Sequence, residues 1–219
     1  MSRTLLARTA PLLLLLAGTP VLAQTTVFTD DFQGGNIKPQ WSANTTVNTA
    51  NEGVFSWYNG RYSTQAIHLN LPAAPAAPSG QFNRYTLRFD LLALDSWDGN
   101  NPEFGPDSFR VAANGATVFN ETFSNWDSNQ TYGAPTVGPT LLGADPRWPD
   151  SIYRGVTVAF TPGNGQAIDL KFWSTANQGL NDESWGIDNV SVSYSVVPAP
   201  AAFAVPAVAG LAGLRRRRA

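Results

Sequence analysis

The chain has 219 residues, with one His and no Cys, a length that suits one domain with targeting tails. Six of its 14 basic residues lie at the two ends, so residues 24–197 keep eight basic residues against 16 acidic ones, a net charge of −8. This charge excludes nucleic acid as a partner, because phosphate backbones bind basic surfaces. The absence of Cys excludes disulfides and thiol chemistry, and a single His excludes a multi-histidine metal site.

The amino-terminal end has the pattern of a secretory signal peptide, which we expect to cover residues 1–23. Arg3 and Arg8 provide a positive amino-terminal region, Pro11–Leu16 begins a leucine-rich segment, and Val21-Leu22-Ala23 offers small residues for cleavage. The apolar run is short for a bilayer of about 30 Å. We therefore favour export and cleavage over the alternative of an uncleaved anchor.

The body of the chain, residues 24–197, has the pattern of a β domain. Apolar residues alternate over Tyr85–Ala93, and no long segment has helical periodicity. Asn114-Gly115 predicts a hairpin because both residues tolerate positive φ, and Asn59-Gly60 predicts another turn. Further strands are expected at Phe109–Val111, Thr117–Phe123, Val156–Phe160, Ile168–Phe172 and Val190–Val196. About ten short strands predict an all-β fold, an antiparallel β-sandwich of the jelly-roll, lectin-like type.

Two aspartates continue the apolar alternation of their strands. Asp95 follows Ala93 by two residues, and Asp188 precedes Val190 by two, so both carboxylates are expected at the rim of the core. A carboxylate withdrawn from water without a partner is too costly to keep ionised. Each must therefore be protonated, paired with an arginine or bound to a cation.

The neighbouring loops are rich in oxygen ligands. Asp107 begins the strand that returns after Asp95, and we expect the two to lie side by side. Calcium takes about six to eight oxygen ligands and needs neither His nor Cys. The sequence predicts one or two structural Ca²⁺ sites with ligands from Asp95, Asp98, Asp107, Asp182, Glu183 and Asp188. The alternative is that these acids cap turns and pair with Arg84, Arg88 or Arg110.

Several short segments resemble lectin-like or carbohydrate-binding sandwich domains of exported bacterial proteins. They are Asp95–Gly99, Pro106–Val111 and Asp182–Val190, together with Thr29–Phe32 followed by Trp41. The closing Gly-Ile-Asp-Asn-Val is similar to the final strand of jelly-roll modules in which an aspartate near that place ligates calcium. The resemblance implies a sandwich that carries calcium and binds sugars.

Aromatic residues supply candidate sugar contacts. Aromatic faces suit the apolar faces of sugar rings, and the ligand-binding candidates are Trp97, Trp126, Tyr132 and Trp148, in expected loops or strand ends. Core packing is an equal alternative for Trp97 and Trp126. Trp41, Trp57 and Trp173 are expected in the core. We expect no catalysis, because the chain lacks a nucleophile elbow and the alternating acids of sandwich glycosidases, and His68 has no recognisable catalytic partners.

The carboxyl-terminal tail, residues 198–219, combines three features. Pro198 and Pro200 precede an apolar run over Ala201–Leu214, expected as a short hydrophobic helix, and the chain then carries Arg215, Arg216, Arg217 and Arg218. This layout resembles the PEP-CTERM sorting signal of Gram-negative bacteria that make exopolysaccharide, with Ala199 where Glu is usual. The resemblance implies an exosortase-type processing enzyme as partner and a transient association with the inner membrane. An ordinary membrane anchor is the alternative.

These features lead to one leading hypothesis. The protein is expected to be an exported, non-catalytic component of the cell surface or extracellular matrix, with a calcium-stabilised sandwich that binds exopolysaccharide. A purely structural biofilm protein that binds no glycan is one alternative. A polysaccharide hydrolase is the other.

Overall fold

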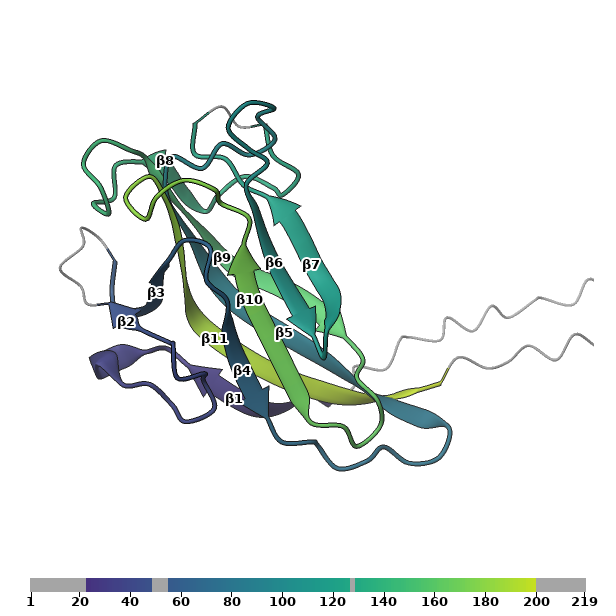
Figure 1. Ribbon diagram of the computed structural model, residues 1–219. Coiled ribbons are helices and arrows are strands. Elements are labelled where there is room, and N and C mark those ends of the chain that lie inside the picture. Colours follow the sequence, from purple (N-terminus) through teal and green to yellow (C-terminus); the bar gives the residue numbers. More distant parts are fainter. Residues whose placement is uncertain (1–22, 49–54, 127–128, 200–219) are drawn as a thin grey trace, which may run out of the picture.

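The computed structural model describes residues 23–48, 55–126 and 129–199, and it is built of two antiparallel β-sheets (Figure 1). The larger sheet contains β1 (Thr25–Asp30), β2 (Val47–Asn48), β3 (Tyr58–Tyr62), β5 (Gln81–Asp95), β8 (Val137–Thr140), β9 (Asp150–Phe160) and β11 (Glu183–Pro198). The smaller sheet contains β4 (Ile67–Leu71), β6 (Ser108–Ala113), β7 (Ala116–Thr122) and β10 (Ile168–Ser174). The prediction of an all-β fold is confirmed.

The strand order brings distant segments together. The larger sheet has the order β2-β3-β11-β5-β9-β8, with β1 also paired to β11, and the smaller sheet has the order β4-β10-β6-β7. A short 3₁₀ helix, η1 (Gln33–Gly35), follows β1. In the described residues no helix is long and apolar enough to cross a membrane. The expected signal peptide and the expected carboxyl-terminal helix lie outside the described residues, apart from Ala23 and the pair Pro198 and Ala199.

The two sheets enclose one hydrophobic core, as in a β-sandwich. Leu87 and Phe89 of β5 face Val111 of β6 and Phe172 of β10 within a single buried cluster. The alternation along β5 places these side chains inward. A second, smaller cluster covers the outer face of the larger sheet, where Leu92 packs with Tyr58 and its neighbours. Both faces of β5 are therefore buried over its last residues, 89–95.

The two Asn-Gly pairs have different roles. Asn114 and Gly115 have φ values of 49° and 83° and form the predicted hairpin between β6 and β7. Asn59 and Gly60, in contrast, lie inside β3 and pair with β11, so the predicted turn is wrong. Gly60 is needed there for close approach, because an added Cβ would lie 2.6 Å from Tyr58 Cε2 and 3.0 Å from Gly186 Cα.

We predict that Gly60→Ala destabilises the domain by about 1–3 kcal/mol, because the new methyl group overpacks the Tyr58 ring against β11. Urea unfolding followed by tryptophan fluorescence measures this loss. Gly133→Ala is the matched control, since an added Cβ meets no atom within 4 Å there. Equal stability of the two variants would contradict the close-approach role of Gly60.

Candidate functional site

Three acidic side chains meet at the end of the sandwich where the loops gather. Asp98 and Asp107 come from the segment between β5 and β6, and Glu183 is the first residue of β11. One carboxylate oxygen of each lies within 4.8 Å of the others, and all three residues are buried. We call Asp98, Asp107 and Glu183 the acidic triad. A triad of this kind can hold a metal ion.

The triad has more acceptors than donors. Asp107 Oδ2 accepts the Asp98 N–H at 2.5 Å, whereas Asp107 Oδ1 is buried and has no hydrogen-bond partner among the described residues. Glu183 Oε2 accepts the N–H groups of Asn177 at 2.8 Å and Gln178 at 3.0 Å. The Gln178 side-chain amide donates to both Glu183 Oε1, at 3.0 Å, and Asp98 Oδ2, at 3.3 Å. Ionised carboxylates only accept hydrogen bonds, so a proton or a cation is needed to bridge the facing oxygens of the triad.

The electrostatics of the triad favour neutralisation. Burial, together with the nearby carboxylates of Glu183 and Asp98, raises the pKa of Asp107 to about 7. Burial also raises the pKa of Glu183, and the Asp98 and Asp182 charges add to that rise. Three ionised carboxylates at this spacing therefore repel one another in a poorly solvated place. A divalent cation relieves both costs at once.

We predict that the calcium-free protein loses stability as the pH rises from 5 to 8. The folded-state pKa of Asp107 is about 7 and that of Asp188 about 6, both above the ordinary value of about 4. The folded protein therefore binds more protons than the unfolded chain in this range, and stability falls as they are lost. Melting temperatures in EGTA measure the effect. Saturating Ca²⁺ should remove the part of the loss that comes from Asp107 and leave the smaller part that comes from Asp188. A melting temperature in EGTA that does not change with pH would contradict the prediction.

Asp95 lies beside the triad but has a different partner. It is fully buried, but on the face of the sheet opposite the predicted one, because Arg61 and Ser184, which its carboxylate meets, alternate with the core residues Tyr62 and Trp185. Asp95 has a φ of 72°. Its carboxylate accepts hydrogen bonds from Arg61 and from the Ser184 hydroxyl, the latter at 3.0 Å, and does not contact Glu183 in the triad. Asp107 does not pair with Asp95 across a hairpin as expected, because β5 and β6 belong to different sheets. Asp95 is thus an ion-pair partner of Arg61 rather than a member of the triad.

Asp188 lies on the opposite face of the larger sheet from the one predicted. A register shift between β5 and β11 follows Asp188, where Asn189 has a φ of 49°. This bulge inserts a residue, so Ile187 and Val190 both face the core and Asp188 points outward. There it lines a small pocket of about 50 Å³ together with Asp90 and Arg154. Burial, with the nearby Asp90 charge, raises the pKa of Asp188 to about 6.

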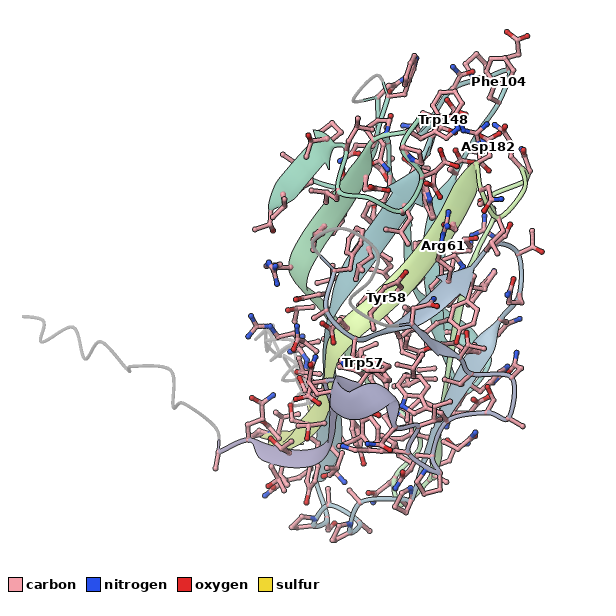
Figure 2. All side chains as sticks on the ribbon, turned by 90° about the vertical axis from the view of Figure 1, so that its left-hand side faces the viewer. Trp57, Tyr58, Arg61, Phe104, Trp148 and Asp182 are labelled. Atoms are coloured by element: carbon pink, nitrogen blue, oxygen red, sulfur yellow. The ribbon has the colours of Figure 1, made fainter. Side chains whose placement is uncertain are left out.

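A groove adjoins the triad. Asp98 and Gln178 line it together with exposed aromatic rings, and it has a volume of about 260 Å³. Its remaining lining residues are Ser96, Asn101, Phe104, Trp126, Trp148 and Asp182. Figure 2 places Phe104, Trp148 and Asp182 close together at the loop end, above Arg61. Aromatic faces beside amides and carboxylates are the combination that sugar rings need.

A second hollow continues the groove. Trp148 and Asp182 also line this hollow, of about 380 Å³, together with Arg147 and residues 179–181. Trp126 is 65% exposed, and its ring centroid lies 5.8 Å from that of Trp148 in an edge-to-face contact. The Asp182 carboxylate accepts the Ser96 hydroxyl at 2.8 Å. Asp182 thus forms part of the groove wall and lies outside the triad.

Two of the expected ligand-binding aromatics belong to the core instead. Trp97 is completely buried, and its indole N–H donates to the Ser184 carbonyl at 2.7 Å. Tyr132 is partly buried and packs against the rings of Phe123 and Tyr153. The core alternative is therefore correct for Trp97, and Tyr132 packs against the core and does not line the groove described above. Trp126 and Trp148 remain candidates.

Sequence reasoning missed three residues that shape this end of the molecule. Gln178 joins two triad carboxylates, Phe104 forms a wall of the groove, and Arg61 neutralises Asp95. Gln178 and Phe104 lie in loops where no periodicity marks a direction for the side chain. Arg61 follows the Asn-Gly pair that predicted a turn. Of the expected sorting residues, Pro198 ends β11, and Pro200, Arg215, Arg216, Arg217 and Arg218 lie outside the described residues.

Comparisons with known proteins place the chain in no family. No protein-family model matches it, and no curated protein matches it. A crystal structure of dimeric latent PorU from Porphyromonas gingivalis is similar at 14% identity and a TM-score of 0.45, over 83% of this chain and 14% of that one. BtGH115A, a family GH115 4-O-methyl-alpha-glucuronidase with specificity for decorated arabinogalactans, is similar at 13% identity and a TM-score of 0.38, over 85% of this chain and 19% of that one. The chain thus spans less than a fifth of either structure.

Proposed function

We propose that this protein is an exported, non-catalytic component of the cell surface or extracellular matrix of a Gram-negative bacterium, whose calcium-stabilised sandwich binds exopolysaccharide. The observation that carries the proposal is the groove lined by Phe104, Trp126 and Trp148 directly beside the acidic triad. The two sheets are compatible with a jelly roll of the lectin-like kind. An exosortase-type enzyme is the proposed processing partner.

Calcium is the proposed occupant of the triad. Asp98, Asp107 and Glu183 would supply hard carboxylate oxygens, which calcium prefers and which magnesium uses less often in all-protein sites. Zinc is disfavoured because the chain has no Cys and its one His, His68, pairs with Asp169 on the smaller sheet. When bound, the ion would neutralise the triad. It would thereby stabilise the loop end of the sandwich.

The position of the tail supports a display role. Glu183 of the triad is the first residue of the 16-residue strand β11, and the expected sorting signal begins at its last residue, Pro198. At about 3.3 Å per residue, β11 spans roughly 50 Å. Figure 1 shows the loop end at the top and the end of β11 at the lower right. A protein attached through this tail would therefore present its groove away from the attachment point.

Glycan retention on an array of bacterial polysaccharides, with 2 mM Ca²⁺ present, tests the binding proposal. Trp148→Ala should lower retention about fivefold or more, because stacking of a ring on an aromatic face contributes on the order of 1 kcal/mol. Trp173→Ala, on β10 of the smaller sheet and outside the groove, is the matched control. Absence of retention on every glycan would favour the purely structural biofilm protein. New reducing ends would favour the hydrolase.

A further inference from the structure

Two loops form facing walls of the groove. The first runs from residue 96 to residue 107, between β5 and β6, and contributes Asn101 and Phe104. The second runs from residue 175 to residue 182, between β10 and β11, and contributes Gln178. β-ladders fix the bases of both loops, because β5 pairs with β11 up to Asp95 and Glu183, and β6 pairs with β10 up to Phe109 and Ser174. Next to the first of these ladders, the Ser96 N–H donates to the Asp182 carbonyl at 2.7 Å. The middle parts of the two loops lie beyond the ladders, so direct contacts between them must set the width of the groove there.

Each loop is tied to a different part of the triad. In the first loop Asp107 holds Asp98 through the 2.5 Å bond to its N–H, and the Asp107 N–H donates to the Gly99 carbonyl at 2.9 Å. In the second loop the Glu183 carboxylate holds the N–H groups of Asn177 and Gln178. Between the loops run the Gln178 amide to Asp98, at 3.3 Å, and the Asn177 amide to the Phe104 carbonyl, at 3.1 Å. These links work against the repulsion between Glu183 and the two aspartates of the first loop.

A cation in the triad would replace the repulsion between the carboxylates of the two loops with attraction. Ionised Asp98 and Asp107 repel Glu183 when nothing lies between them, and a shared divalent ion attracts all three. Asp107 and Glu183 are fully buried and Asp98 is 8% exposed, so a glycan in the groove has little access to the ion. Any effect of the ion on a glycan must therefore pass through the positions of the loops.

We propose that the metal ion held by Asp98, Asp107 and Glu183 is a clasp between the two loops, so that calcium concentration sets the affinity of the groove for its glycan. This inference rests on the proposed function, because it assumes the calcium site and the glycan groove. It adds a regulatory link between them. The protein would bind its polysaccharide where calcium is plentiful and release it where calcium is scarce, with the sandwich folded in both states.

Hydrogen exchange of the full chain tests the clasp without a glycan. Backbone amides are compared in 2 mM CaCl₂ and in EGTA at pH 7.5, with melting temperatures measured in parallel. We expect amides of both loops, including those of Asn177 and Gln178, to exchange at least about tenfold more slowly with calcium, because a bound ligand suppresses local opening. The hairpin at Asn114-Gly115, where β6 returns as β7, should exchange equally in both conditions and serves as the internal control.

The possible results separate the clasp from the calcium site. A calcium-induced rise in melting temperature without slower exchange in the loops would overturn the clasp and leave the calcium site intact. Absence of both effects would overturn the calcium site itself. Asp107→Asn should lose the calcium-dependent protection of both loops, whereas Glu103→Gln, an exposed acid of the first loop, should keep it. Protection that survives in Asp107→Asn would also overturn the proposal.

Discussion

Asp107→Asn is expected to raise the melting temperature of the calcium-free protein at pH 8 and to abolish the further rise that calcium causes. Ionising a fully buried carboxyl whose pKa is about 7, rather than the ordinary 4, costs on the order of 4 kcal/mol of folding stability. The asparagine amide removes that cost. It can also donate to Glu183 from the position of Asp107 Oδ1, which has no partner. The same substitution removes a charged ligand, so calcium should no longer bind tightly.

A gain in stability without calcium, combined with loss of the response to calcium, makes this test specific. For a domain of this size, 1 kcal/mol changes the melting temperature by roughly 2–4 °C. We therefore expect a rise of about 5 °C or more in EGTA and no further rise in 2 mM CaCl₂, both measured by differential scanning calorimetry. Glu103→Gln lies in the same loop and is exposed, so its melting temperatures should equal those of the unmodified protein. A calcium response retained in Asp107→Asn would exclude Asp107 as a ligand.

The strands were predictable where alternation was unbroken. The inward series from Tyr85 to Ala93 and the hairpin at Asn114-Gly115 follow from period two and positive φ. Asn59-Gly60 has the same dipeptide but serves close strand approach, and the sequence alone carries no sign of the Tyr58 ring above it. Local chemistry thus predicted a turn where packing requires a glycine inside a strand.

Three of the six acids predicted as calcium ligands form a group that could hold a metal ion. Asp98, Asp107 and Glu183 come together, although they were predicted along with three acids that lie elsewhere. Alternation predicted that Asp188 would face inward, but one inserted residue at Asn189 changes the face. The partner of Asp95 was unpredictable because Arg61 lies 34 residues earlier in the chain. Bulges and distant partners arise from tertiary pairing, which periodicity does not report.

Arg61→Met is expected to destabilise the protein by about 3–5 kcal/mol at pH 8, because it leaves the buried Asp95 carboxylate without its counter-ion. Asp95 would keep only the Ser184 hydroxyl at 3.0 Å, and its Oδ1 already has no hydrogen-bond partner among the described residues. The Arg61 guanidinium also donates to the Leu180 carbonyl at 2.8 Å. Urea unfolding at equilibrium measures the loss.

A matched arginine and a second substitution separate lost charge pairing from lost packing. Arg154 pairs with Asp90 at 3.3 Å, but its side chain is 54% exposed, so Arg154→Met should cost less than about 1 kcal/mol.

Burial already raises the pKa of Asp95, and loss of Arg61 should raise the pKa of Asp95 further. The folded variant then takes up a proton as the pH falls, so its deficit should shrink between pH 8 and pH 5. Adding Asp95→Asn to Arg61→Met should recover most of the stability at pH 8, since it removes the uncompensated charge. If the loss of stability in Arg61→Met changes neither with pH nor on adding Asp95→Asn, Arg61 stabilises this end of the sandwich by packing alone.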